Sequence, residues 1–135
     1  MSRRDDNDFV LQNKAKDLYV YTSEAVGNTK VIPKHRRYTT GQRLESMALD
    51  IFLGVAAANN KDIKKHFDER QEIQDEVIAL CDTMKSLINA LKASKAYPGV
   101  DTHKSEVWTR HILDVFHMTK AWRDNEWERH QEENT

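Results

Sequence analysis

The sequence predicts an all-α protein, folded as one antiparallel, up-down four-helix bundle. Apolar residues recur at alternating steps of three and four along most of the chain, and no stretch alternates like a strand. Pro33 and the Pro98-Gly99 pair divide the chain into pieces joined by short connections, which place consecutive helices side by side. The length of 135 residues, with 39% apolar and 32% charged residues, suits a single globular domain.

The first two helices are expected at about 8–32 and 39–59, after a flexible N-terminus at 1–7. In the first, one face carries Leu11, Ala15, Leu18, Thr22, Ala25, Thr29 and Ile32. In the second, the corresponding face carries Leu44, Ala48, Ile51, Val55 and Ala58. Thr39, with Gln42 three residues later, predicts a capping box at its start.

The third helix is expected at about 61–95 and the fourth at about 102–127. The third keeps a heptad spacing through Ile73, Val77, Leu80, Met84, Leu87 and Leu91. The fourth begins after a predicted cap at Asp101 or Thr102 and carries Trp108, Ile112, Val115, Thr119 and Trp122 on one face. The bundle is therefore predicted to span 8–123, followed by a polar, acidic tail at 124–135 that frays.

The sequence lacks the motif spacings that common catalytic and metal sites require. Di-iron bundles use inward Glu-x-x-His motifs, whereas the residues three before His111, His117 and His130 are Trp108, Asp114 and Trp127. The sequence has no Gly-rich phosphate loop and no Gly-x-Ser-x-Gly elbow. We therefore expect a protein that is not an enzyme and that has no cofactor and no bound metal.

Hydropathy along the chain bears on cellular location, and the position of the single cysteine bears on thiol chemistry. No apolar run approaches the roughly 18–20 residues that a membrane span needs, and the N-terminal residues lack the apolar core of a secretion signal. A cytoplasmic protein without membrane contact is expected. The only cysteine, Cys81, lies in an apolar helical pattern and is expected to be a small buried side chain.

The second helix is apolar around most of its circumference between residues 47 and 58. If its first face packs in the bundle, Met47, Phe52 and Leu53 project elsewhere, and a second apolar face usually marks an interface between subunits. A wide core stripe, covered by large side chains of the fourth helix, is the alternative interpretation. Both stay open at this point.

A basic cluster lies between the first two helices, in the stretch IPKHRRYTTGQRL (32–44). Its candidate nucleic-acid contacts are Lys34, Arg36, Arg37, Tyr38 and Arg43. The two adjacent guanidinium groups match phosphate geometry, and the neighbouring aromatic ring can stack on a base. The same residues are also compatible with an ordinary solvated turn.

Charge is distributed unevenly along the chain, and Arg70 and Trp127 stand out from the helical patterns. The net charge is −1, but residues 1–44 carry nine Lys or Arg against five Asp or Glu, whereas 124–135 carry one Arg against five acids. Arg70 occupies an apolar heptad position and is expected to pair with an acid inside the bundle, for example Asp50 or Asp114. Trp127 lies out of phase with Trp122 and is expected to be exposed or to staple the tail.

The stretch IPKHRRYTTGQRLESMALDIFLGVAAAN resembles the corner and second helix of the accessory variability determinant family of diversity-generating retroelements. The resembling features are the Pro-Lys, the Arg-Tyr-Thr, the Gly, the Arg-Leu and the final Ala-Asn. The bundle proteins encoded in intervening sequences of bacterial large-subunit rRNA are similar in length and organisation. Their second helix tends to run into an Asn-Ile-Ala-Glu-Gly type of motif, which this chain lacks, so the retroelement branch is favoured.

The resemblance implies a pentameric, ring-like assembly with two kinds of partner: a reverse transcriptase, and RNA or DNA. The expected function is that of an accessory protein that supports mutagenic reverse transcription. The alternative is a structural oligomer, or a protein of the rRNA intervening-sequence type, that binds protein without contacting nucleic acid directly.

Overall fold

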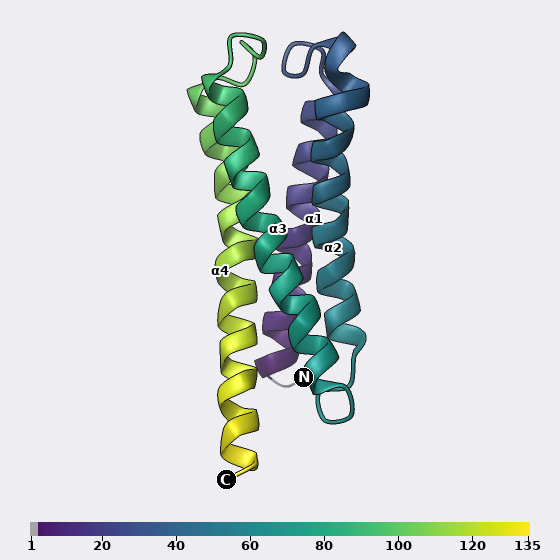
Figure 1. Cartoon of the computed structure of the whole chain (residues 1–135), viewed down its shortest axis with the longest axis vertical. Helices are drawn as coiled ribbons and strands as arrows, with labels where there is room; N and C mark the ends of the chain where they lie inside the picture. Colours follow the sequence, from purple (N-terminus) through teal and green to yellow (C-terminus); the bar gives the residue numbers. More distant parts are fainter. Residues whose placement is uncertain (1–2) are drawn as a thin grey trace.

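The protein is represented by a computed structural model that describes residues 3–135. Across these residues there are four long α-helices and no strand: α1 (Arg3–Gly27), α2 (Gln42–Asn60), α3 (Phe67–Ala93) and α4 (Thr102–Glu133). The α1–α2 and α3–α4 connections lie at the top of Figure 1, while the α2–α3 connection and the C-terminus lie at the bottom. Each helix packs on two others, and the four surround one elongated core.

The predicted faces of α1, α2 and α4 form much of that core. Every predicted position of α2 is buried, and the α4 face is buried from Trp108 to Thr119, with Trp122 half-buried. The first helix was predicted to reach residue 32, but α1 ends at Gly27, and Thr29 is therefore exposed. Ile32 is buried as predicted, although it belongs to the α1–α2 connection and not to the helix. The Trp108 indole donates a hydrogen bond to the Thr22 hydroxyl at 2.9 Å, which satisfies both polar groups in the core.

The buried stripe of α3 is rotated relative to the predicted heptad. Val77, Met84 and Leu91 are buried as predicted, but Ile73, Leu80 and Leu87 are only half-buried. Their neighbours one position later, Gln74, Cys81 and Ile88, fill the centre instead. The cause is that α3 packs against both α2 and α4, so its apolar stripe is wider than a two-helix seam. Burial raises the pKa of the Cys81 thiol to about 12, which keeps it protonated at neutral pH.

The start of α2 corrects one prediction. The chain passes through a 3-10 turn (Lys34–Arg36) and a π-helical turn (Arg37–Gly41) before α2 begins. Gly41 is already helical, with φ −60° and ψ −48°, so no extended residue is available to act as a side-chain cap. The Thr39 hydroxyl instead donates to the Arg36 carbonyl at 3.2 Å. The predicted capping box is therefore wrong.

The two other helix starts have local causes. α3 begins at Phe67 rather than near 61, because the Asp62 carboxylate accepts hydrogen bonds from the backbone N–H groups of Lys64 and Lys65 at 3.0 and 2.7 Å and closes a turn. These bonds also lower the pKa of Asp62. At α4, the Asp101 carboxylate accepts from the Lys104 N–H at 2.8 Å, which confirms Asp101 as the cap.

Both ends of the chain contain more helix than predicted. α1 starts at Arg3, so residues 3–7 of the predicted flexible segment are helical, and residues 1–2 lie outside the described residues. α4 continues to Glu133 through the predicted tail. Two side chains explain the extension: Glu126 is buried, and the His130 ring stacks on Phe67 with 3.7 Å between ring centroids.

Candidate nucleic-acid interface

The α1–α2 connection is a fixed structure built around two buried residues. Val31 and Ile32 are 3% and 0% exposed, and their backbone N–H groups both donate to the Asn28 carbonyl, at 2.9 and 3.0 Å. Pro33 follows with φ −54° and opens the 3-10 turn, whose Arg36 N–H donates to the Pro33 carbonyl at 2.8 Å. This anchoring leaves the polar residues after Pro33 on the outside.

The α3–α4 connection packs directly against this corner. The buried Tyr97 makes a short hydroxyl–hydroxyl hydrogen bond with Thr40, and the Arg36 guanidinium lies 5.6 Å from the Tyr97 ring centroid. A Cβ atom on Gly99 would lie only 1.8 Å from the Lys30 carbonyl oxygen. The two connections therefore form one continuous surface at the top of Figure 1.

That surface, which we call the basic end, consists of residues 24–45 and 92–106. The first segment carries five Lys or Arg against two Glu, and the second carries three Lys against one Asp and one Glu. Sequence reasoning identified the first segment alone. Lys92, Lys95 and Lys104 were missed because they join the corner only through the packing of the two connections.

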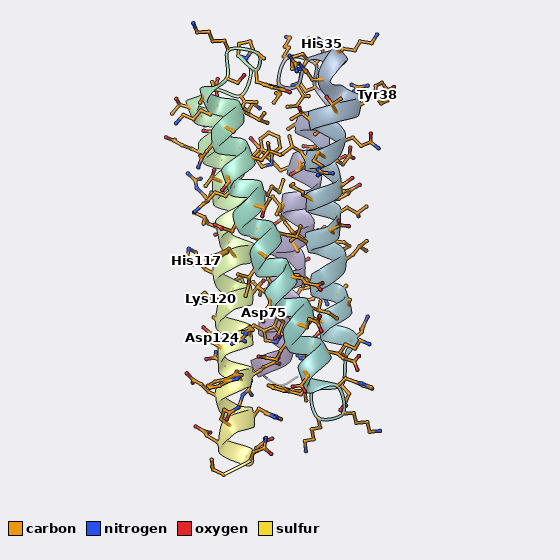
Figure 2. All side chains as sticks on the ribbon, viewed as in Figure 1. His35, Tyr38, Asp75, His117, Lys120 and Asp124 are labelled. Carbon is orange, nitrogen blue, oxygen red and sulfur yellow. The ribbon has the colours of Figure 1, made fainter. Side chains whose placement is uncertain are left out.

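The predicted contact residues differ in how freely they are presented. Lys34 and Arg43 are exposed and have no side-chain partner among the described residues. Tyr38 is 82% exposed and points away from the bundle (Figure 2). The Arg37 guanidinium donates to the Gly27 carbonyl at 3.2 Å and remains partly exposed. Arg36 is half-buried like Arg37, and its guanidinium lies against the Tyr97 ring.

A cleft of about 440 Å³ lies between the last turn of α1 (23–27) and residues 37–45, and we call it the corner cleft. Val26 and Gly27 contribute from α1, whereas Arg37, Tyr38 and Gln42 contribute from the other side. The two sides are joined by a hydrogen bond from the Ser23 hydroxyl to the Glu45 carboxylate at 3.0 Å. Nothing in the one-dimensional pattern placed Ser23 beside Glu45, so the cleft was not predicted.

The predicted interface residues of α2 divide into two groups. Met47 and Phe52 are half-buried and pack against the core. Leu53 is 52% exposed and, with Leu49 at 38%, presents an outward apolar pair one helical turn apart. Gly54 has a role inside the chain, since a Cβ there would lie 2.6 Å from a Val77 methyl group.

The opposite end of the bundle contains a buried ion pair with a different acid from those predicted. Arg70 pairs with Glu126, at 2.7 Å from Nη2 to Oε2 and 2.9 Å from Nε to Oε1, and these side chains are 4% and 0% exposed. Asp50 is exposed, and Asp114 lies 3.6 Å from Lys14. Sequence reasoning missed Glu126 because it assigned residues 124–135 to a tail.

Neighbouring groups satisfy the rest of this pair. Arg70 Nη1 donates to the carbonyls of Ala58 and Lys61 at the end of α2, at 3.0 and 2.9 Å, and the Gln74 amide donates to Glu126 at 2.8 Å. The Arg70 guanidinium also lies 4.8 Å from the Trp122 ring centroid. These contacts join α2, α3 and α4, which indicates a structural role. Trp127 nearby is 44% exposed, as expected.

Fold and site together define a class: an all-α protein of four helices with one basic end. In the described part of the chain, no helix is long and apolar enough to cross a membrane. Residues 3–135 also contain no group of three or more His, Cys, Asp or Glu side chains arranged to hold a metal ion. No protein-family model, curated protein or solved structure matches the chain.

Proposed function

We propose that the protein is a non-enzymatic accessory protein of a diversity-generating retroelement, which binds a reverse transcriptase and RNA or DNA to support mutagenic reverse transcription. The observation that carries the nucleic-acid part is the basic end, where two connections and the helix turns beside them bring together eight Lys or Arg against four acids. The reverse transcriptase as partner rests on the resemblance of residues 32–59 to the accessory variability determinant family.

The basic end has the components of a sequence-tolerant nucleic-acid surface. Lys34 and Arg43 have no acidic partner among the described residues, so contact with phosphate breaks no ion pair. Tyr38 offers an aromatic face that is 82% exposed, and a base can stack on it. Near-neutral total charge is compatible with this function because the positive charge is gathered at one end.

Assembly is the second part of the proposal. Antiparallel bundles would pack through the outward face of α2, where Leu49 and Leu53 are exposed, into a pentameric ring. A ring repeats the basic end around one rim, and several weak contacts on a single nucleic acid then act together.

Nucleic-acid binding should fall steeply with salt, and removing two exposed cations should reduce that dependence. Neutralised phosphates release counterions, so Lys34→Ala with Arg43→Ala is expected to lower the slope of log affinity against log salt by about 1.4 per subunit for a single strand. Fluorescence anisotropy of a labelled RNA over a salt series measures this slope.

Lys64→Ala with Lys65→Ala is the matched control. It removes two exposed lysines from the α2–α3 connection at the opposite end (Figure 1) and should leave the slope unchanged. An equal effect of the two pairs, or no binding of the native protein at low salt, contradicts a binding role for the basic end.

Replacing Leu53 by aspartate is expected to dissociate the oligomer without unfolding the subunit. Leu53 is 52% exposed, so a charge there meets water in the monomer but lies in an apolar contact in the assembly. Light scattering gives the mass, and circular dichroism confirms the helices. Ala121→Asp, at an exposed position of α4, controls for added charge, because α4 packs on α1 and α3 and lies away from the outward face of α2. A native protein that is monomeric at tens of micromolar concentrations contradicts the assembly.

The alternative is a structural, protein-binding module, including one of the rRNA intervening-sequence type. It is favoured by the C-terminal end of α4, where the half-exposed Trp127 lies among five acidic residues between 124 and 135. Oligomer formation together with absent nucleic-acid binding would select this alternative. A reverse-transcriptase gene and a template/variable repeat pair beside the coding sequence would select the retroelement function.

A further inference from the structure

We propose that the corner cleft binds one guanine base of a single-stranded nucleic acid. The inference rests on the proposed function, because it assumes that a strand reaches the basic end, and it adds a base preference to that contact. It is carried by three features of the cleft: a free aromatic ring, a carboxylate without a cationic partner, and open space beside a glycine.

The cleft can receive a flat ring. Tyr38 is 82% exposed and makes no ring contact with another described residue, so its face is available for stacking. On the other side, Val26 lines the cleft with a small apolar area, since the residue is only 3% exposed. A Cβ built on Gly27 would meet nothing within 4 Å, which leaves space at the end of α1. Splayed bases of single strands are commonly held by aromatic stacking of this kind.

The polar groups of the cleft favour guanine over the other bases. Glu45 accepts one hydrogen bond from Ser23 at 3.0 Å and forms no ion pair among the described residues, so its carboxylate can accept further N–H groups. Guanine alone places two adjacent donors, N1–H and N2–H, on its Watson–Crick edge. Adenine and cytosine would set a ring-nitrogen lone pair against the carboxylate, and uracil would set a carbonyl there.

Two further side chains complete the site. The Gln42 amide lines the same cleft and can donate to guanine O6. The Arg37 guanidinium stands at the rim with one nitrogen on the Gly27 carbonyl at 3.2 Å, and its other donors can reach a phosphate. Phosphate contacts beside a base pocket fit a nucleotide within a strand better than a free base.

Short oligonucleotides test the preference directly. Eight-residue, uridine-rich strands with a single central guanine, adenine, cytosine or inosine are measured by anisotropy at one low salt concentration, as RNA and as DNA. We expect the guanine strand to bind about tenfold more tightly than the adenine and cytosine strands, as bidentate base contacts do. The inosine strand lacks the N2 amino group and should bind with an affinity between that of the guanine strand and those of the adenine and cytosine strands.

Two variants locate the preference in the cleft. Glu45→Gln removes one acceptor position and adds a donor, so it should equalise guanine, adenine and cytosine. Glu106→Gln, at an exposed glutamate of α4 at the same end, is the charge-matched control and should keep the tenfold preference. Gly27→Leu adds a bulky side chain at a residue that lines the cleft, without altering charge, and should lower the affinity of the guanine strand to that of the other strands.

The outcomes separate this inference from the function on which it rests. If no strand binds at low salt, the proposed nucleic-acid function fails, and the guanine site fails with it. If all strands bind equally with a salt slope that depends on Lys34 and Arg43, the function stands and the guanine site is wrong. A preference that survives Glu45→Gln also overturns the site, as does GMP competing as well as the strand, which would indicate a free nucleotide.

Discussion

Replacing Arg70 by methionine is expected to lower the free energy of unfolding by about 3–5 kcal/mol, which is a large part of the stability of a small domain. The change removes the Arg70 guanidinium from the Glu126 carboxylate, whose side chain is 0% exposed and cannot turn to water for compensation. It also removes the donor that satisfies the carbonyls of Ala58 and Lys61 at the end of α2. Urea unfolding followed by circular dichroism measures the loss.

A second arginine provides the matched control. The Arg123 guanidinium donates a hydrogen bond to the Asp75 carboxylate at 2.9 Å. These side chains are 29% and 55% exposed, so water can replace the hydrogen bond when Arg123 is removed. Arg123→Met should therefore cost within about 1 kcal/mol. If Arg70→Met is equally mild, the buried network does not hold the end of the bundle together.

Replacing Gly99 by alanine is expected to destabilise the protein by about 2–3 kcal/mol and to loosen the basic end. The added Cβ would lie 1.8 Å from the Lys30 carbonyl oxygen and 2.8 Å from the Val31 Cα. Both are backbone atoms, so the two connections must move apart for the methyl group to fit. Hydrogen exchange at the Val31 and Ile32 amides should accelerate, because their hydrogen bonds to Asn28 belong to the displaced segment.

The control is the same substitution at Gly27. Its Cβ would meet nothing within 4 Å, and alanine is the better helix former, so Gly27→Ala should be neutral or stabilising by up to about 1 kcal/mol. A loss at Gly27 as large as that at Gly99 would show that the clash with Lys30 is not the cause.

The helices and most of the core could be predicted because their signal is local. In α2, the five apolar residues from Leu44 to Ala58 recur at steps of three and four in the sequence, and all five are buried. The phase of α3 was misplaced because two adjacent rows are apolar, and the choice between Leu80 and Cys81 depends on where α2 and α4 lie. Periodicity cannot supply that information.

The site was predictable only where it is continuous in sequence. The cluster from Lys34 to Arg43 was found, but its union with Lys92 and Lys95 requires the contact of Tyr97 with Thr40, which are 57 residues apart. Similarly, Arg70 indicated a buried acid, but the sequence pattern could not show which of Asp50, Asp114 and Glu126 lies beside it in the folded chain. The Thr39 capping box failed because a π-helical turn had already begun the helical path.

The separation of charge along the bundle has a further consequence for assembly. The basic end lies at the top of Figure 1, while the C-terminal part of α4, with five acids and one Arg, lies at the bottom. The molecule therefore has an electric dipole along its long axis, and a polyanion turns the basic end toward itself before contact. Neighbours aligned in the same direction repel each other through these dipoles, and salt screens that repulsion. If subunits assemble into the proposed ring in parallel, salt would strengthen that ring and weaken the proposed binding of nucleic acid, so assembly and binding would have opposite dependences on ionic strength.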